Sequence, residues 1–141
     1  KLSLIDKSTS EFAHKGGFSI NSFNDLKKCI ELYDSNRFLN HFPKVELIKG
    51  DATRTIPKYL KKNPATVVSL LYLDFVLYEP TKVALKHFVP RMPKGSIIAF
   101  NLINDTLHWP GTTKALFDTL GIKIKLKKFS FSPYTQYAIL E

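Results

Sequence analysis

The feature of this sequence that most constrains its fold is an unbroken apolar run, TVVSLLYLD, at residues 66–74. The run is rich in β-branched and aromatic side chains, and it is bounded by polar residues and prolines. Such a run is typical of a strand that is buried on both faces, and hence of a central strand in a parallel sheet. It delivers one carboxylate, Asp74, at the carboxyl end of that strand.

The rest of the chain alternates between helix and strand patterns, which indicates an α/β layer structure. The expected helices lie at 22–36, 54–63, 80–89 and 111–121, and the expected strands at 44–50, 66–74, 94–102, 122–130 and 135–141. Gly121 is expected to end the last helix. Pro133 separates the last two strands, which suggests an antiparallel pair at the carboxyl end.

A length of 141 residues corresponds to one domain with one core. Apolar residues make up 44% of the chain, enough to fill that core and to exclude a disordered protein. No apolar run approaches the roughly 20 residues that cross a bilayer. The single cysteine, Cys29, falls on the apolar side of an expected helix and should be buried. We therefore expect a cytoplasmic protein in a reducing compartment, with no membrane partner.

The net charge of +9 raises the question of nucleic-acid binding. The densest basic stretch, 123–131, places three lysines on one side of an alternating strand: Lys123, Lys125 and Lys127. A solvated lysine face of this kind is common at the edge of a sheet. No aromatic platform for bases is interleaved with these lysines. We therefore expect nucleic acid to be an unlikely partner, bound weakly and in a salt-sensitive way.

Three polar side chains follow successive expected strands. Asp51 comes after the first strand, Asp74 after the second and Asn101 after the third. Ligands of open α/β sheets lie beyond the carboxyl ends of the strands, so we expect these three to line one crevice. Each also has a structural alternative: Asp51 as the cap of the following turn, Asp74 as the cap of the helix near Pro80, and Asn101 as a turn residue.

Four stretches together carry a family resemblance: VELIKGDATRTIPKYL, LLYLDFVLYEPTKVAL, PRMPKGSIIAFNLIN and WPGTTKAL. From about Lys15 to Glu141 the chain resembles the later part of S-adenosylmethionine-dependent methyltransferases of the macrocin and mycinamicin sugar O-methyltransferase type. The resemblance implies part of a Rossmann-like class I sheet, with parallel strands and an antiparallel carboxyl-terminal pair. Residues 1–141 would form a single α/β domain, the later portion of a methyltransferase domain that lacks the first two strands.

The resemblance also implies roles for the crevice residues. Asp51 and Ala52 match the place where the family holds the adenine of S-adenosylmethionine. Asp74 matches the first acid of a D-x-D-x-Y pattern, which the family uses at the metal and cofactor side of the site. Val76 stands where the family has its general base, and Asn101 stands where it has the next metal-binding aspartate.

Two further acids of the family pattern are replaced, by Leu102 and Thr112. Valine cannot accept a proton, and Asp74 with a neutral Asn101 is a poor donor set for Mg²⁺, which prefers carboxylates and held waters. His108, in the loop that borders the acceptor, could act as a substitute base. We therefore expect a degenerate site. Its candidate catalytic residues are Asp74 and His108, and its candidate metal ligands are Asp74 and Asn101, a set that is expected to bind Mg²⁺ weakly or not at all.

The resulting hypothesis is a member of the methyltransferase family, ancestrally acting on a sugar or small-molecule hydroxyl, whose activity is in doubt. The alternative is a non-catalytic binding module that reuses the fold. In the family, two strands absent here separate strand 44–50 from strand 66–74. Either these two strands pair directly in this chain, or self-association or a partner chain completes the sheet.

Overall fold

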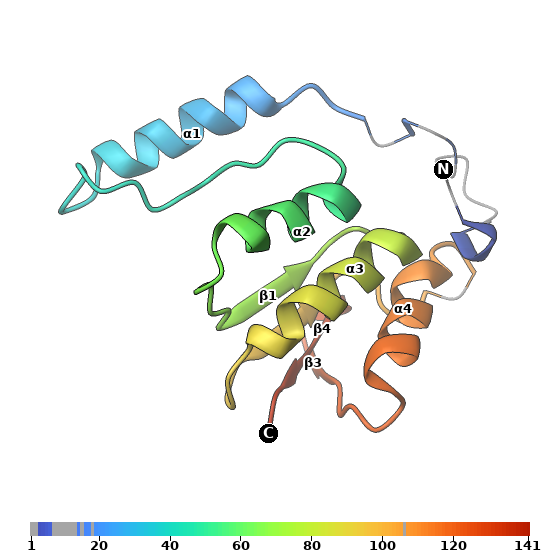
Figure 1. The fold of residues 1–141 in the computed structure, drawn as a ribbon. Helices are drawn as coiled ribbons and strands as arrows, with labels where there is room; N and C mark the ends of the chain where they lie inside the picture. The colour runs from blue at the N-terminus through green and yellow to red at the C-terminus, as the bar shows by residue number, and fades with distance from the viewer. Residues whose placement is uncertain (1–2, 7–13, 15, 18, 106) are drawn as a thin grey trace.

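The computed structural model of the chain describes residues 3–6, 14, 16–17, 19–105 and 107–141. Its elements are η1 (Leu4–Asp6), α1 (Phe23–Ser35), α2 (Ala52–Lys62), β1 (Leu70–Leu73), α3 (Tyr78–Phe88), η2 (Val89–Arg91), β2 (Ile97–Phe100), α4 (Pro110–Leu120), β3 (Lys127–Phe129) and β4 (Ser132–Ile139) (Figure 1). Four strands form one sheet in the order β1-β2-β4-β3. β1 and β2 are parallel, whereas β4 is antiparallel to both of its neighbours. The expected α/β class with an antiparallel carboxyl-terminal pair is therefore confirmed.

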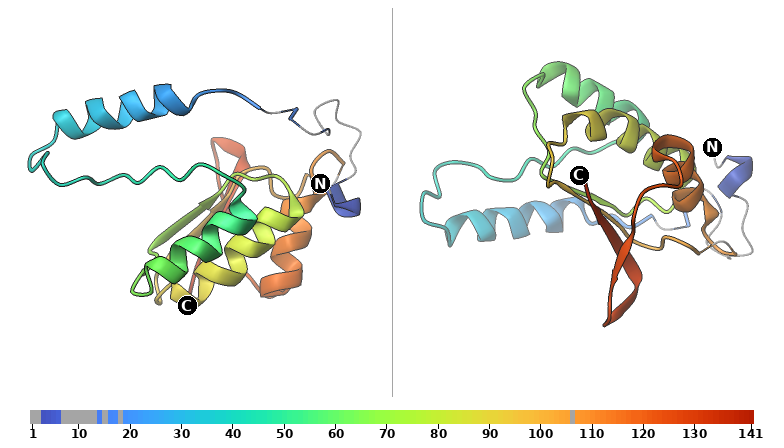
Figure 2. Two further views of the ribbon diagram at one scale, coloured as in Figure 1. Left: turned by 45° about the horizontal axis from the view of Figure 1, so that its top comes forward. Right: turned by 90° about the horizontal axis from the view of Figure 1, so that it is seen from below.

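The core lies between the sheet and one layer of helices (Figure 2). Leu71 and Leu73 of β1 are paired in register with Ile98 and Phe100 of β2, and all four side chains are buried. They form one cluster with side chains of α3 and α4, including Leu85. Burial of a large aliphatic or aromatic side chain stabilises the fold by about 1.5–3 kcal/mol, so this cluster fixes how the helices sit on the sheet.

The expectation that 66–74 is buried on both faces is wrong. The strand is four residues long, and its side chains alternate between buried and exposed. Leu70 is 60% exposed and Tyr72 is 53% exposed. The physical reason is that α2, α3 and α4 cover only the opposite face, and within the described residues β1 pairs with β2 alone.

The expected strand at 44–50 is also wrong, because residues 43–49 have no regular secondary structure. They lie with α1 in an arm that extends away from the sheet (Figures 1 and 2). The expected helix at 22–36 is confirmed as α1, but it buries no residue. Cys29 is consequently exposed rather than buried, since α1 lies in this arm and buries none of its residues.

The carboxyl-terminal strands form the expected antiparallel pair, but β4 begins at Ser132, before the expected residue 135, and it contains Pro133, so the expectation that this proline separates the two strands is wrong. The strand expected at 122–130 is reduced to β3, and Gly121 caps α4 with a φ of 76°, a backbone conformation that favours glycine. Ile124 and Leu126 pack against the core, whereas the three alternating lysines are exposed. The solvated lysine face is therefore confirmed over the segment that leads into β3.

A buried carboxylate near the amino end joins the starts of two helices. Asp6 is 3% exposed, and its Oδ1 accepts a hydrogen bond of 2.8 Å from the backbone N–H of Tyr78, the first residue of α3. Its Oδ2 accepts a 2.6 Å hydrogen bond from the hydroxyl of Ser3. A negative charge at a helix start is stabilised by the helix dipole and by the free N–H groups there. Asp6 thus supplies the cap that α3 lacks from its own sequence.

The same carboxylate explains a glycine in α4. A Cβ on Gly111 would collide with Asp6 Oδ1, and it would lie 2.5 Å from the backbone nitrogen of Tyr78. Glycine is normally unfavourable inside a helix, so its presence here is explained by the close approach of α4 to Asp6 and to the start of α3.

We predict that Gly111→Ala destabilises the chain. Helix propensity alone would make this change stabilising by roughly 0.5–1 kcal/mol. The overlap with backbone atoms cannot be relieved by a side-chain rotation, so a net loss of about 1–3 kcal/mol is expected in urea unfolding. Gly95→Ala is the control, because no atom lies within 4 Å of its Cβ position and only its φ of +86° is unfavourable. A Gly111→Ala variant as stable as the parent would contradict the proposed packing.

Candidate functional site

The site is built where β1 and β2 end side by side. The register that pairs Leu73 with Phe100 makes Asp74 and Asn101 the next residues on each strand. The backbone N–H of Asn101 donates to the carbonyl of Leu73 at 3.0 Å, which continues the pairing by one step. The Asn101 side-chain amide then donates to Asp74 Oδ1 at 2.9 Å. Parallel pairing thus places a carboxylate and an amide together at one edge of the sheet.

This pair opens into a pocket of about 360 Å³. The pocket is lined by Asp74, Phe75, Val76, Asn101 and Leu102. Its apolar side chains come from the two loops that follow the strands, and its polar groups come from the strand ends. A small number of polar groups on a mainly apolar wall is the usual composition of a small-molecule site.

Two of the lining residues have an unusual backbone conformation. Val76 has a φ of 54° and Leu102 a φ of 52°, both in the left-handed region. Only glycine adopts this region freely, and a residue held there costs about 1–3 kcal/mol. Such strain is concentrated at ligand-binding and catalytic sites. These are also two of the positions at which the resemblance implies an acid. The left-handed backbone at these positions therefore does not require an acidic side chain.

The donor set of this pocket does not fit Mg²⁺. Asp74 supplies the pocket's single carboxylate, and one of its oxygens already accepts from the Asn101 amide. In the described part of the chain, no group of three or more His, Cys, Asp and Glu side chains is placed to hold a metal. Mg²⁺ requires several hard oxygen ligands in octahedral geometry, so no step of a reaction is assigned to it here.

Asp51 is not among the residues that line this pocket with Asp74 and Asn101. It is the N-cap of α2, and its Oδ1 accepts from the backbone N–H of Thr53 at 2.9 Å and from the Thr53 hydroxyl at 2.8 Å. These hydrogen bonds, the side-chain one foremost, lower the pKa of Asp51 below its ordinary value. The capping alternative for Asp51 is therefore correct. Ala52 follows as the first residue of α2.

The capping alternative for Asp74 is wrong. The N-cap of α3 is Leu77, and the first N–H of that helix bonds to Asp6. Asp74 is bonded instead to Asn101, so both residues keep a place at the strand ends. No sequence pattern points to Asp6, because its partner Tyr78 is 72 positions away. The Ser3-x-x-Asp6 spacing indicates only the local turn.

His108 belongs to the loop between β2 and α4, and it does not line the pocket. Its backbone N–H and its Nδ1 lie 3.0 Å and 3.1 Å from Asp105 Oδ1. Burial pushes the pKa of Asp105 up, but the hydrogen bonds from His108 outweigh it, so this pKa lies below its ordinary value. In the tautomer whose Nδ1–H donates to Asp105, Nε2 carries the free lone pair.

Thr112, the fourth position at which the resemblance implies an acid, lies in α4 and is 1% exposed. It does not line the pocket. The adjacent Thr113 accepts a 2.8 Å hydrogen bond from the backbone N–H of Asn104, which ties α4 to the loop that follows β2. The helix therefore shapes the pocket through this loop rather than by a side chain at its wall.

No helix of the described residues is both long and apolar enough to cross a membrane.

Comparison with known proteins identifies the fold. No protein-family profile matches the chain, and no curated protein sequence does. Several solved structures are similar to it, among them two of CalS11. The crystal structure of CalS11, a calicheamicin methyltransferase, matches 98% of this chain and 55% of its own, with a TM-score of 0.91 and 32% identity. The apo structure of CalS11, described as a TDP-rhamnose 3′-O-methyltransferase of calicheamicin biosynthesis, matches 82% of this chain and 50% of its own, with a TM-score of 0.77 and 36% identity.

The chain spans about half the length of the CalS11 chains that it matches. The match covers nearly all of its elements, including the strands that carry Asp74 and Asn101. It agrees with the resemblance in the sequence, and with an open sheet that ends in antiparallel strands. The chain therefore has the fold of a sugar O-methyltransferase, of which it covers a carboxyl-terminal portion.

Proposed function

We propose that this chain forms the acceptor side of an S-adenosylmethionine-dependent O-methyltransferase whose substrate is the hydroxyl of a sugar or another small molecule. The observation that carries the proposal is the Asp74–Asn101 pair at the mouth of a pocket, at the carboxyl ends of two parallel strands. The neighbours with this fold are methyltransferases, and one of them is described as acting on TDP-rhamnose. Ligands of open α/β sheets lie in this position.

Methyl transfer to a hydroxyl requires a group that orients the hydroxyl and accepts its proton. S-adenosylmethionine, when bound, supplies a methyl group on a positively charged sulfur. As the hydroxyl oxygen forms its bond to that methyl carbon, the carbon–sulfur bond breaks and the hydroxyl proton must leave. Asn101 holds one oxygen of Asp74, and the other oxygen makes no hydrogen bond to the described residues. That second oxygen is the group we assign to accept the proton.

His108 is a second candidate for this role. Its orientation by Asp105 resembles the arrangement in which a carboxylate positions the imidazole of a general base. Its position in a loop outside the pocket lining argues for Asp74 as the first choice. A change in the loop between β2 and α4 would be needed to bring it to an acceptor in the pocket.

The cofactor end of the site is represented by Asp51 and Ala52. Capping of α2 uses Oδ1 of Asp51, which leaves Oδ2 for a donor such as the adenine amino group. The neighbouring alanine is small enough to lie against a flat ring. The residues present therefore fit the adenine end of S-adenosylmethionine, and we assign no group of this chain to its other parts.

The alternative function is a non-catalytic module that binds a small molecule or another protein. It is favoured by the apolar side chains at the acid positions, Val76 and Leu102. It predicts that the pocket binds a ligand without a dependence on the Asp74 charge. The two functions therefore differ in an observable way.

We predict that Mg²⁺ does not stabilise this protein. Stabilisation by a ligand that binds only the folded state rises with its concentration relative to the dissociation constant. With one carboxylate in the pocket, the melting temperature at millimolar Mg²⁺ should equal that in Ca²⁺-free and Mg²⁺-free buffer. Asn101→Asp is the matched variant, because it places a second carboxylate beside Asp74 and should gain a Mg²⁺-dependent rise. A rise in the parent chain that Asp74→Asn abolishes would show that a working metal site exists.

We predict that the 141-residue chain alone binds S-adenosylmethionine no more tightly than about 1 mM, and that it transfers no methyl group. One or two polar contacts, each contributing about 1–3 kcal/mol, do not offset the cost of immobilising a flexible ligand. Titration calorimetry with S-adenosylmethionine and S-adenosylhomocysteine measures the affinity, and nucleotide sugars serve as acceptors in the transfer assay. Micromolar binding that Asp51→Ala removes would mean that the cofactor pocket is complete in this chain.

We predict that TDP-rhamnose, used as the acceptor probe, binds at Asp74. Chemical-shift changes should be confined to residues 74–76 and 101–102, and Asp74→Asn should weaken binding roughly tenfold, as expected for a lost charged hydrogen bond. His108→Gln is the control and should leave the affinity unchanged. Binding that is insensitive to Asp74→Asn would favour the non-catalytic module, and a larger effect of His108→Gln would move the acceptor to the loop between β2 and α4.

A further inference from the structure

The pocket at the ends of β1 and β2 combines one polar pair with apolar walls. Asp74 and Asn101 are its polar side chains, and Phe75, Val76 and Leu102 form the rest of its lining. All three apolar side chains are half-buried. The volume of about 360 Å³ lies near the lower end of the range for small-molecule sites, which is about 300–1,000 Å³. The pocket is therefore suited to a small acceptor with more apolar surface than polar groups.

A sugar ring is poorly matched to this lining. A sugar carries several hydroxyl groups, and each one that enters the pocket loses its hydrogen bonds to water. The side chains of the pocket offer few replacements, because Asn101 already donates to Asp74 Oδ1 at 2.9 Å. A buried hydroxyl without a partner costs free energy. The lining therefore favours an acceptor that carries a single hydroxyl on an apolar frame.

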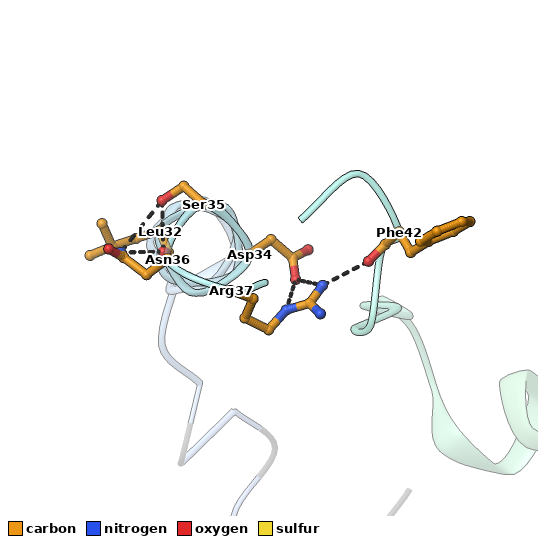
Figure 3. A network of polar contacts seen from close by, with 6 residues as sticks. All are labelled: Leu32, Asp34, Ser35, Asn36, Arg37 and Phe42. Carbon is orange, nitrogen blue, oxygen red and sulfur yellow. Dashed lines mark hydrogen bonds and ion pairs between the residues drawn. The ribbon is translucent and has the colours of Figure 1, made fainter. Parts of the chain in front are cut away.

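The phosphates of a nucleotide sugar gain no partner in the pocket, because none of the described residues that line it is cationic. Arginine is the side chain best suited to phosphate. Two of the three arginines of the chain bind groups of the chain itself, and the third does not line the pocket. Arg37 donates to Asp34 Oδ1 at 2.9 Å and 2.6 Å and to the carbonyl of Phe42 at 2.7 Å, in the turn of the arm (Figure 3). Arg91 donates to the carbonyl of Pro64 at 2.6 Å. The pocket therefore fits a neutral acceptor.

Removal of the hydroxyl proton sets a further condition on the acceptor. A bound metal ion can lower the pKa of water from about 15.7 to about 7, but the donor set of this pocket does not fit Mg²⁺. A carboxylate is a weak base, so the acidity has to come from the acceptor itself. A phenol hydroxyl has a pKa of about 10, whereas an alcohol hydroxyl is closer to water at about 15.7. A single carboxylate can therefore take the proton of a phenol far more readily than that of an alcohol.

An aromatic ring also suits the walls of the pocket. Phe75 packs in part against the buried core cluster and in part lines the pocket, so its position is set by the core. Two aromatic rings in contact attract each other by more than the burial of their area. Val76 and Leu102, with φ values of 54° and 52°, each place an aliphatic side chain at the pocket from a different loop. One aromatic and two aliphatic side chains are apolar partners for a flat ring.

We propose that the acceptor of this pocket is a phenol. Its ring contacts Phe75, Val76 and Leu102, and its hydroxyl donates to the Asp74 oxygen that Asn101 does not hold. In the reaction the phenol oxygen forms a bond to the methyl carbon of S-adenosylmethionine. The carbon–sulfur bond breaks, its electron pair stays on sulfur, and the phenol proton passes to Asp74. The products are an aryl methyl ether and S-adenosylhomocysteine. This assignment rests on the proposed function and selects one class among the acceptors named there.

Four probes test this assignment on the 141-residue chain by chemical-shift titration. They are phenol, cyclohexanol, anisole and methyl rhamnoside. Cyclohexanol keeps a hydroxyl on a six-membered ring but is neither aromatic nor acidic, and anisole keeps the aromatic ring but has no proton to donate. Methyl rhamnoside is a sugar without a nucleotide. Phenol should shift residues 74–76 and 101–102 and should bind roughly fivefold more tightly than each of the other three, as expected for one added hydrogen bond to a charged group.

Three variants separate the hydroxyl contact from the ring contact. Asp74→Asn should lower the affinity for phenol to that for anisole and leave anisole unchanged. Phe75→Leu keeps an apolar wall without the ring, so it should weaken phenol and anisole alike and leave cyclohexanol unchanged. Phe131→Leu is the matched control, because Phe131 is 83% exposed and does not line the pocket. Thermal unfolding checks each fold, and the comparison of probes on the parent chain does not depend on any variant.

The outcomes distinguish this assignment from the proposed function. Cyclohexanol or methyl rhamnoside that binds at residues 74–76 and 101–102 as tightly as phenol overturns the phenol class, but leaves the pocket as an acceptor site. Anisole that binds as tightly as phenol overturns the phenol class and favours the non-catalytic module, since the reacting hydroxyl is then not held. The same holds for phenol binding that is insensitive to Asp74→Asn. If none of the four probes shifts these residues, the phenol class and the proposed function are both overturned.

Discussion

The parallel pairing of β1 with β2 is the interaction on which the rest of the structure depends. It sets the buried side chains of both strands against α3 and α4, so it defines the core. The same register brings Asp74 beside Asn101, because each is the first residue after its strand. A slip of one residue would turn the apolar side chains to the other face and separate this polar pair. Core packing and the candidate site therefore share one cause, and neither can be changed without the other.

Sequence patterns predicted this part of the molecule well, because the signals were local. The apolar runs of β1 and β2, the helix periods and Gly121 gave the α/β class, and the strand ends gave Asp74 and Asn101. Patterns failed where the outcome depends on what packs nearby. An apolar run indicates that both faces are suited to burial, but it does not say whether a second layer is present, and β1 is covered on one face only. Asp6 was missed because its partner is far away in the sequence.

The apolar side chains that line the pocket and its backbone shape have different physical origins. Val76 and Leu102 keep a left-handed backbone although neither side chain favours it. Such a conformation persists when the surrounding structure fixes it, and here the starts of α3 and α4 are fixed by Asp6 and by the close approach at Gly111. The framework can therefore hold this pocket shape with apolar side chains at both positions. The resemblance implies acids at four positions where this chain has none, and their absence would account for part of the net charge of +9, which makes that charge a weak argument for a nucleic-acid partner.

Completion of the sheet and function of the pocket are coupled through β1. The pocket begins at the carboxyl end of this strand, and the outer edge of the same strand is free. A strand added at that edge would end beside Asp74 and would extend the wall of the pocket, since the carboxyl ends of parallel strands meet at one edge of the sheet. It would also lower the local dielectric, which strengthens any hydrogen bond from a hydroxyl to the Asp74 carboxylate. Weak binding of S-adenosylmethionine by residues 1–141 alone is therefore compatible with the methyltransferase fold and with the acceptor role that we propose for Asp74, because that role depends on how fully the pocket is enclosed at the open edge of β1.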